Sequence, residues 1–152
     1  MHDRDRRHGE GHAGQAGGGT GSGPGAGRGA PPEMTGAEPG SVGAVFASAN
    51  STRGLDAVES AALRLAFDGA PPPVCSVRGA IGESGAAGAA SAVAACFALA
   101  EGRLPGTAGL SETDPALGLD AAPGARRLAA GRVLVTGFSR GGSAVALVLG
   151  AA

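Results

Sequence analysis

Residues 86–99 (AAGAASAVAACFAL) are small or apolar on every side, and they constrain the fold more than any other segment. Their composition predicts a helix without a polar face. Such a helix must be buried all round, and this one is too short to cross a bilayer. A globular part of about 110 residues can enclose one face of it but hardly all of them. We therefore expect a covering layer from another chain or from a missing segment.

The first forty residues are dominated by glycine, which predicts a disordered tail at 1–40 and a single folded domain at 41–152. His2, His8 and His12 lie in this tail. We expect no metal site there, because a metal ion would have to order a flexible chain around itself. No strand precedes the glycines, so they do not form a phosphate-binding loop, and we expect no cofactor.

Charge and cysteine content narrow the possible partners and the cellular location. The net charge of -1 gives no reason to expect binding to nucleic acid or to an anionic membrane. Cys75 and Cys96 form neither a metal-ligand spacing nor a disulfide framework, so we expect two small buried residues in a reducing cytoplasm. Residues 1–12 lack the apolar region of a signal peptide. Without such a signal, we do not expect the N-glycosylation motif at 50–52 to be used.

Apolar segments with strand and helix patterns alternate along the chain and are separated by glycine and proline, which predicts an α/β protein. Residues 42–49 (VGAVFASA) and 74–77 predict two short buried strands. The helix between them begins at Asp56 and ends near Gly69, and its apolar positions recur at helical spacing: Val58, Ala62, Leu65 and Ala66.

The rest of the chain is divided by glycine and proline. Residues 78–85 and 104–120 predict loops. Residues 132–135 (RVLV) predict a strand, followed by a glycine-rich turn at 137–142. Residues 144–149 (AVALVL) then form either another strand or a helix.

Four strings follow one another in an order and at distances typical of one enzyme family. They are residues 49–52 (ANST) leading to Asp56, Glu59 and Ala62-Leu63; residues 77–83 (VRGAIGE) with 85–89 (GAAGA); residues 101–105 (EGRLP) with Asp114-Pro115, Leu117 and Leu119; and residues 138–142 (FSRGG) with 146–149 (ALVL). Together they resemble the C-terminal half of the β-ketoacyl synthases, the condensing enzymes of fatty-acid and polyketide assembly. The resemblance implies the C-terminal half of a thiolase-like fold, with a mixed sheet and a buried Ala-rich helix.

The resemblance also implies that the catalytic residues are lost. The family has histidines at the positions of Asn50 and Glu83, where they help decarboxylate a malonyl unit and stabilise the enolate oxygen. A glutamate carboxylate would repel that oxygen, whereas catalysis needs hydrogen-bond donors aimed at it. The family's nucleophilic cysteine lies in the N-terminal half, and Cys75 falls in a strand that the family does not use for catalysis. We therefore expect no condensation by this chain alone.

Two arginines replace other family residues. Arg78 stands where the family has a lysine, and Arg140 stands where it has a gating phenylalanine. The backbone N–H at position 140 belongs to an oxyanion hole in the family, within the turn that contains Phe138, Gly141 and Gly142. We expect Glu83 to pair with Arg140 or Arg78, because an unpaired carboxylate there would be costly.

The resemblance implies a non-catalytic subunit similar to the chain-length factors, which form a heterodimer with a ketosynthase. The partner would be a ketosynthase subunit or a separate N-terminal half, and an acyl carrier protein would be engaged only indirectly.

Two alternatives stay open. One is a truncated remnant of a 3-oxoacyl-[acyl-carrier-protein] synthase, an acyltransferase. The other is a truncated α/β-hydrolase, because residues 137–141 match the Gly-x-Ser-x-Gly elbow with Ser139 as nucleophile. No histidine or aspartate follows Ser139, and the elbow needs a helix rather than a strand at 144–149.

Overall fold

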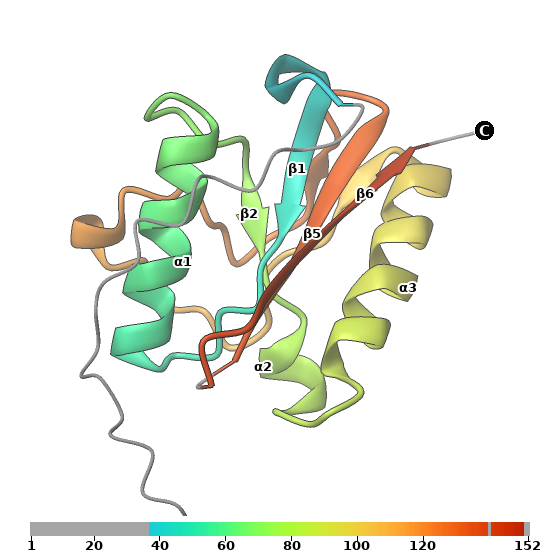
Figure 1. The fold of residues 1–152 in the computed structure, drawn as a ribbon. Coiled ribbons are helices and arrows are strands. Elements are labelled where there is room, and N and C mark those ends of the chain that lie inside the picture. The colour runs from blue at the N-terminus through green and yellow to red at the C-terminus, as the bar shows by residue number, and fades with distance from the viewer. Residues whose placement is uncertain (1–36, 140, 151–152) are drawn as a thin grey trace, which may run out of the picture.

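A computed structural model describes residues 37–139 and 141–150 of the chain. A four-stranded sheet in the order β2-β1-β5-β6 lies between two long helices, one on each face (Figure 1). The strands are β1 (Val42–Phe46), β2 (Val74–Cys75), β5 (Arg132–Phe138) and β6 (Ala144–Gly150). Strand β1 runs parallel to β2 and β5, whereas β6 is antiparallel to β5. The predicted α/β class with a mixed sheet is confirmed.

Shorter elements connect these layers. Strands β3 (Arg103–Leu104) and β4 (Arg126–Arg127) form a small antiparallel sheet, and two 3-10 helices lie at η1 (Pro39–Ser41) and η2 (Pro115–Leu117). Most of the expected tail at 1–40 lies outside the described residues. Helix η1 falls at its very end.

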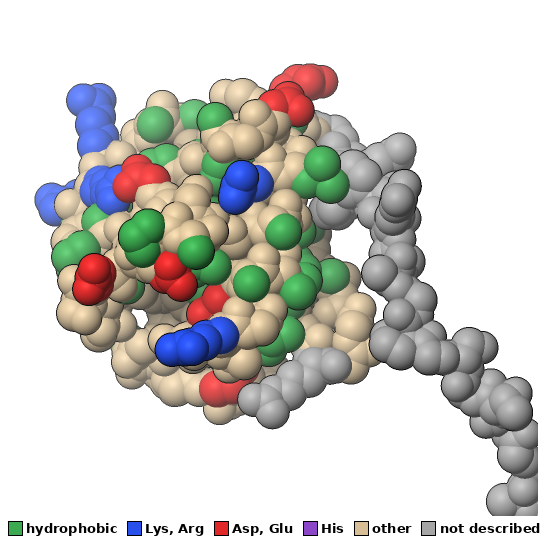
Figure 2. Space-filling view, turned by 90° about the vertical axis from the view of Figure 1, so that its left-hand side faces the viewer, with side chains coloured by type: hydrophobic (Ala, Val, Ile, Leu, Met, Phe, Trp, Pro, Cys, Tyr) green, Lys and Arg blue, Asp and Glu red, His purple; other side chains and the backbone are tan. Residues whose placement is uncertain are grey.

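Helix α1 (Arg53–Ala66) forms where a helix was predicted, but it begins at Arg53 rather than at Asp56 and ends at Ala66. It buries Glu59, Ser60 and Leu63, whereas Val58 is 57% exposed and Leu65 is 61% exposed. The apolar residues at helical spacing thus do not all face the sheet. On this side of the molecule apolar side chains lie scattered among charged ones (Figure 2).

The buried polar residues of α1 are accommodated because each finds a hydrogen-bond partner. The Glu59 carboxylate accepts hydrogen bonds from the backbone N–H of Ser48, at 2.8 Å, and from the Thr136 hydroxyl on β5. The Ser60 hydroxyl donates to the carbonyl of Leu117 in η2. Glu59 therefore joins α1 to the ends of β1 and β5, which an apolar residue at this position would not do.

Helix α3 (Ala87–Glu101) covers the opposite face of the sheet and has the predicted extent to within two residues. Its inward residues Ala87, Ser91, Ala95 and Ala98 are buried. Val93 is 57% exposed and Phe97 is 63% exposed. Within the described residues the chain thus covers one face of this apolar helix and leaves the other uncovered, as its size predicted.

Two details of the sequence expectations are corrected here. Residues 78–85 are not entirely loop, because α2 (Arg78–Ile81) forms a short helix there. Cys75 is buried as expected, but Cys96 is exposed on α3.

The C-terminal segment is a strand. Strand β6 pairs with β5 along its whole length, from Phe138↔Ala144 to Arg132↔Gly150. Residues 137–139 and 141–142 therefore lie at the end of a β-hairpin, and no helix follows them to form a strand-to-helix elbow. The hydrolase alternative with Ser139 as nucleophile depended on a helix and is wrong.

No helix within 37–139 or 141–150 combines the length and the apolar character that crossing a membrane requires.

The inward face of α1 can be tested with a matched pair of substitutions. Leu63→Ala removes a side chain that is 3% exposed and packs between α1 and the sheet, so it should cost about 2–5 kcal/mol of unfolding free energy. Leu65→Ala, two positions away and exposed, should change that free energy by no more than about 0.5 kcal/mol. Urea unfolding followed by circular dichroism measures both. Equal losses would contradict the observed orientation of the helix.

The buried Glu59 should make stability depend on pH. Burial raises the pKa of this carboxyl above its ordinary value of 4.5, outweighing the hydrogen bonds from Thr136 and Ser48; the charge of Asp56 raises it further and that of Arg78 lowers it. The folded state then holds a proton that the unfolded state releases, so stability is greatest below about pH 4.5 and falls as pH rises through the folded pKa.

Glu59→Gln removes this titration and should flatten the stability curve above about pH 4.5. Thermal unfolding across that range measures the effect, with the exposed Glu101→Gln as control. An unchanged pH dependence in Glu59→Gln would show that Glu59 does not govern it.

Candidate functional site

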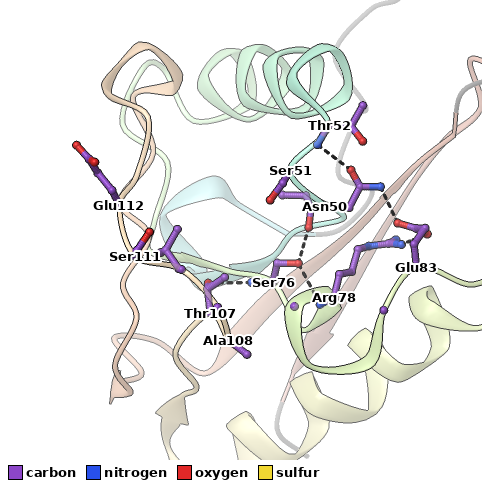
Figure 3. Close-up of a pocket in the computed structure, with 15 residues that line it drawn as sticks. Asn50, Ser51, Thr52, Ser76, Arg78, Glu83, Thr107, Ala108, Ser111 and Glu112 are labelled. Atoms are coloured by element: carbon purple, nitrogen blue, oxygen red, sulfur yellow. Dashed lines mark hydrogen bonds and ion pairs between the residues drawn. The ribbon is translucent and has the colours of Figure 1, made fainter.

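The site lies where the parallel strands β1 and β2 end. The carboxyl ends of parallel strands meet at the same edge of a sheet, so the loops that follow them meet there too. A pocket of about 600 Å³ opens at this edge (Figure 3). Its wall combines residues 49–52 after β1, residues of α2 and the turn after it, and the loop 107–112.

Asn50, where the resemblance implies a histidine in the family, is oriented by its own loop. Its backbone N–H donates to the Asp56 carboxylate at 3.2 Å, and its side-chain oxygen accepts from the N–H of Thr52 at 3.1 Å. The amide nitrogen is therefore free to point across the pocket, where it donates to Oε2 of Glu83 at 2.7 Å. Figure 3 shows this amide directed at the Glu83 carboxylate.

Glu83 pairs with Arg78, one of the two partners expected from the sequence. Nη1 of Arg78 contacts Oε1 of the carboxylate, so the two oxygens of Glu83 receive donors from two different segments. Position 140, the other expected partner, lies outside the described residues. The Arg78 side chain is only 9% exposed, whereas that of Glu83 is 53% exposed. The cation is therefore the fixed member of the pair.

Two hydroxyl residues that the sequence reasoning missed support this arrangement. The Ser76 hydroxyl donates to the carbonyl of Ala49 at 2.6 Å and accepts from the N–H of Arg78 at 3.3 Å. The N–H of Ser76 in turn donates to the Thr107 hydroxyl at 3.1 Å. The only sequence feature that could have indicated Ser76 as a site residue is its position directly after a buried strand. No local feature of the sequence distinguishes Thr107.

Ser51 adopts a backbone conformation that favours glycine. Its φ is 66°, in the left-handed region, where a side chain costs on the order of 1 kcal/mol. The loop after β1 thus makes its left-handed turn at a residue other than glycine.

The C-terminal turn lies on the other side of the ion pair. A second pocket of about 570 Å³ is lined by Arg78 and Glu83 together with Phe138 and Ser139. Gly142 has a φ of 82° and closes the hairpin turn, and Gly141 is exposed. Arg78 and Glu83 therefore separate two pockets, one at the carboxyl ends of β1 and β2 and one beside the hairpin.

Neither cysteine is placed to act as a nucleophile in the first pocket. Cys75 is buried in strand β2, and burial raises the pKa of its thiol to about 12. Cys96 lies on the exposed side of α3. Among the residues that the structure describes, no three His, Cys, Asp or Glu side chains gather as metal ligands. His2, His8 and His12 fall outside those residues.

The arrangement suits binding better than proton transfer. Asn50 and Arg78 both direct hydrogen-bond donors at the Glu83 carboxylate. The Ser76 hydroxyl is held by backbone groups. The described side chains are thus arranged to hold a carboxylate between two donors.

Comparisons with known proteins agree on one family. The family model for the β-ketoacyl synthase C-terminal domain matches residues 30–111, more than half of the chain. No curated protein sequence matches the chain significantly.

Several solved structures share the fold. The ishigamide ketosynthase/chain length factor is 32% identical with a TM-score of 0.71, and the match covers 76% of this chain and 29% of that one. A chain of the complex between the ketosynthase ApeO and its chain length factor ApeC from Xenorhabdus doucetiae is 28% identical with a TM-score of 0.65, over 77% of this chain and 30% of that one.

A type II polyketide synthase acyl carrier protein in complex with its ketosynthase also contains the fold, at 24% identity and a TM-score of 0.70, over 76% of this chain and 29% of that one. The chain thus spans less than a third of the length of these ketosynthase chains. Its strings, its mixed sheet and the matched family model together show that it belongs to the β-ketoacyl synthase family, as a version of the C-terminal domain.

Proposed function

We propose that this chain is a non-catalytic β-ketoacyl synthase-like subunit that acts by pairing with a ketosynthase polypeptide, in the manner of a chain length factor. Its setting would be polyketide or fatty-acid assembly in the cytoplasm. An acyl carrier protein would interact with the assembled pair rather than with this chain alone. The relatives named above include ketosynthases in complex with a chain length factor and with a carrier protein, which supports this setting.

The loss of catalytic chemistry is the first support. Asn50 and Glu83 occupy the family's histidine positions, and both are committed to the contact with each other and with Arg78. A decarboxylating site must stabilise a developing enolate with donors, and a carboxylate held in that place opposes it. The thiol nearest the pocket, Cys75, stays protonated because of its raised pKa.

The single observation that best supports pairing with a ketosynthase is the uncovered side of α3. We call this the α3 face: its exposed residues are Gly88, Ala89, Val93, Cys96, Phe97 and Ala100, and the exposed Glu101 ends the helix. Glu101 is the one charged residue among them, whereas the exposed side of α1 mixes apolar and charged residues along its length. An exposed apolar strip of this kind marks an interaction surface.

Strand β6 extends the same surface. Val145 is 65% exposed and Leu147 is 46% exposed. Side chains alternate along a strand, so both lie on the same side of the sheet as Leu149, which packs against the cluster that includes α3. A partner seated on the α3 face would therefore find further apolar side chains beside it.

The absence of an active thiol can be tested directly. At pH 8, native protein should react with a thiol reagent at Cys96 only, because a thiol with a pKa of about 12 is ionised in roughly one molecule in ten thousand. The Cys96→Ser variant should remain unlabelled until it is unfolded, as mass spectrometry would detect. Rapid native labelling of Cys75 would restore a candidate nucleophile and count against a non-catalytic role.

Pairing can be tested by co-expressing the full chain with a candidate ketosynthase and applying size-exclusion chromatography. The wild type should co-elute with its partner. The double variant Val93→Ser with Phe97→Ser should weaken the complex by on the order of a hundredfold, because it removes two apolar anchors.

The matched control is Val58→Ser with Leu65→Ser, which replaces equally exposed apolar residues on α1 and should leave the complex intact. A stable monomer that binds no ketosynthase would contradict the proposal and favour the alternative of a truncated 3-oxoacyl-[acyl-carrier-protein] synthase. Equal loss from both double variants would show that the α3 face is not the specific contact.

A further inference from the structure

The Glu83 carboxylate sits between two donors as a bound ligand would. Oε2 accepts from Nδ2 of Asn50 at 2.7 Å, and Oε1 contacts Nη1 of Arg78. These donors come from the loop after β1 and from the start of α2, and they converge only in the folded chain. Two donors directed at the two oxygens of one carboxylate make a strong and geometrically selective contact.

The two sides of this contact differ in how firmly they are held. The Arg78 side chain is 91% buried, and its Nε is buried without a hydrogen-bond partner in the described structure. A buried guanidinium needs an anion opposite it. Glu83 is 53% exposed and lies in the turn between α2 and α3, after Gly82, whose φ is 76°. The Arg78 guanidinium is thus buried in the domain, whereas the Glu83 carboxylate that it contacts is at the surface.

Room for another occupant exists on both sides of the contact. Arg78 and Glu83 line the pocket of about 600 Å³ and also the pocket of about 570 Å³ beside the hairpin. Either pocket is large enough to hold a small carboxylic acid with its hydration water. Displacement of the Glu83 side chain would leave the Asn50 amide and the Arg78 guanidinium facing this space.

We propose that Asn50 and Arg78 form a carboxylate-binding site, which Glu83 closes in this structure and which accepts the carboxylate of a small ligand when Glu83 is displaced. This inference rests on the geometry of the pocket and does not depend on pairing with a ketosynthase. An internal carboxylate on a short tether competes at an effective concentration in the millimolar range, so removing it exposes the site to ligands in solution.

The test measures acetate binding to the full chain by isothermal titration calorimetry and ligand-observed NMR, with ionic strength balanced by sodium chloride. Glu83→Ala should bind acetate at least tenfold more tightly than the wild type. The matched control, Glu101→Ala, removes an exposed carboxylate at the end of α3 and should bind acetate as weakly as the wild type. Adding Asn50→Ala to Glu83→Ala should weaken acetate binding again by several fold.

A second readout covers the case in which Glu83→Ala unfolds too easily for titration. Acetate, but not chloride, should then raise the melting temperature of Glu83→Ala, and it should leave Glu83→Gln unchanged because the amide still fills the site. The proposal is overturned if Glu83→Ala gains neither affinity nor stability from acetate. It is also overturned if Glu101→Ala gains as much, because the effect would then reflect net charge alone.

Discussion

The packing of α3 is the constraint on which the rest of the structure depends. Its small inward residues let the helix lie close to β5 and β1, and the larger of the two buried clusters forms between them. The same lack of polar residues leaves an apolar outer side that about 110 described residues cannot cover. The buried contact with the sheet and the exposed apolar side therefore have one origin, because a helix without a polar face is apolar both where it packs on the core and where it meets water.

The opposite face of the sheet is organised by a polar contact rather than by apolar packing alone. Glu59 on α1 binds the N–H of Ser48 at the end of β1 and the hydroxyl of Thr136 on β5. Ser48 in turn accepts from the N–H of Phe138, where the hairpin turn begins. The two segments that border the candidate site are thus fixed to each other through one buried carboxylate, which explains why a glutamate occupies the inward face of α1.

At the site itself, three residues act together. Asn50 supplies a donor, Arg78 supplies a positive charge, and Glu83 supplies the anion that both of them contact. Any one of these residues without the others would leave a donor or a charge unpaired in a partly buried place. The pocket combines the left-handed turn at Ser51 with a set of side chains that holds the Glu83 carboxylate between two donors.

The sequence by itself determined the order of β1, α1, β2, α3 and β5, the apolar outer side of α3 and the absence of histidines from positions 50 and 83, because these follow from residue type and spacing. The tertiary structure decided which face of α1 turns inward, since buried Glu59 depends on hydrogen bonds to strands far away in the chain. It also decided that residues 144–150 form a strand, because pairing with β5 settles what an apolar run leaves open. The contact between Glu83 and Arg78 likewise required the folded turn after α2, which brings into one place charges whose distance the sequence does not specify.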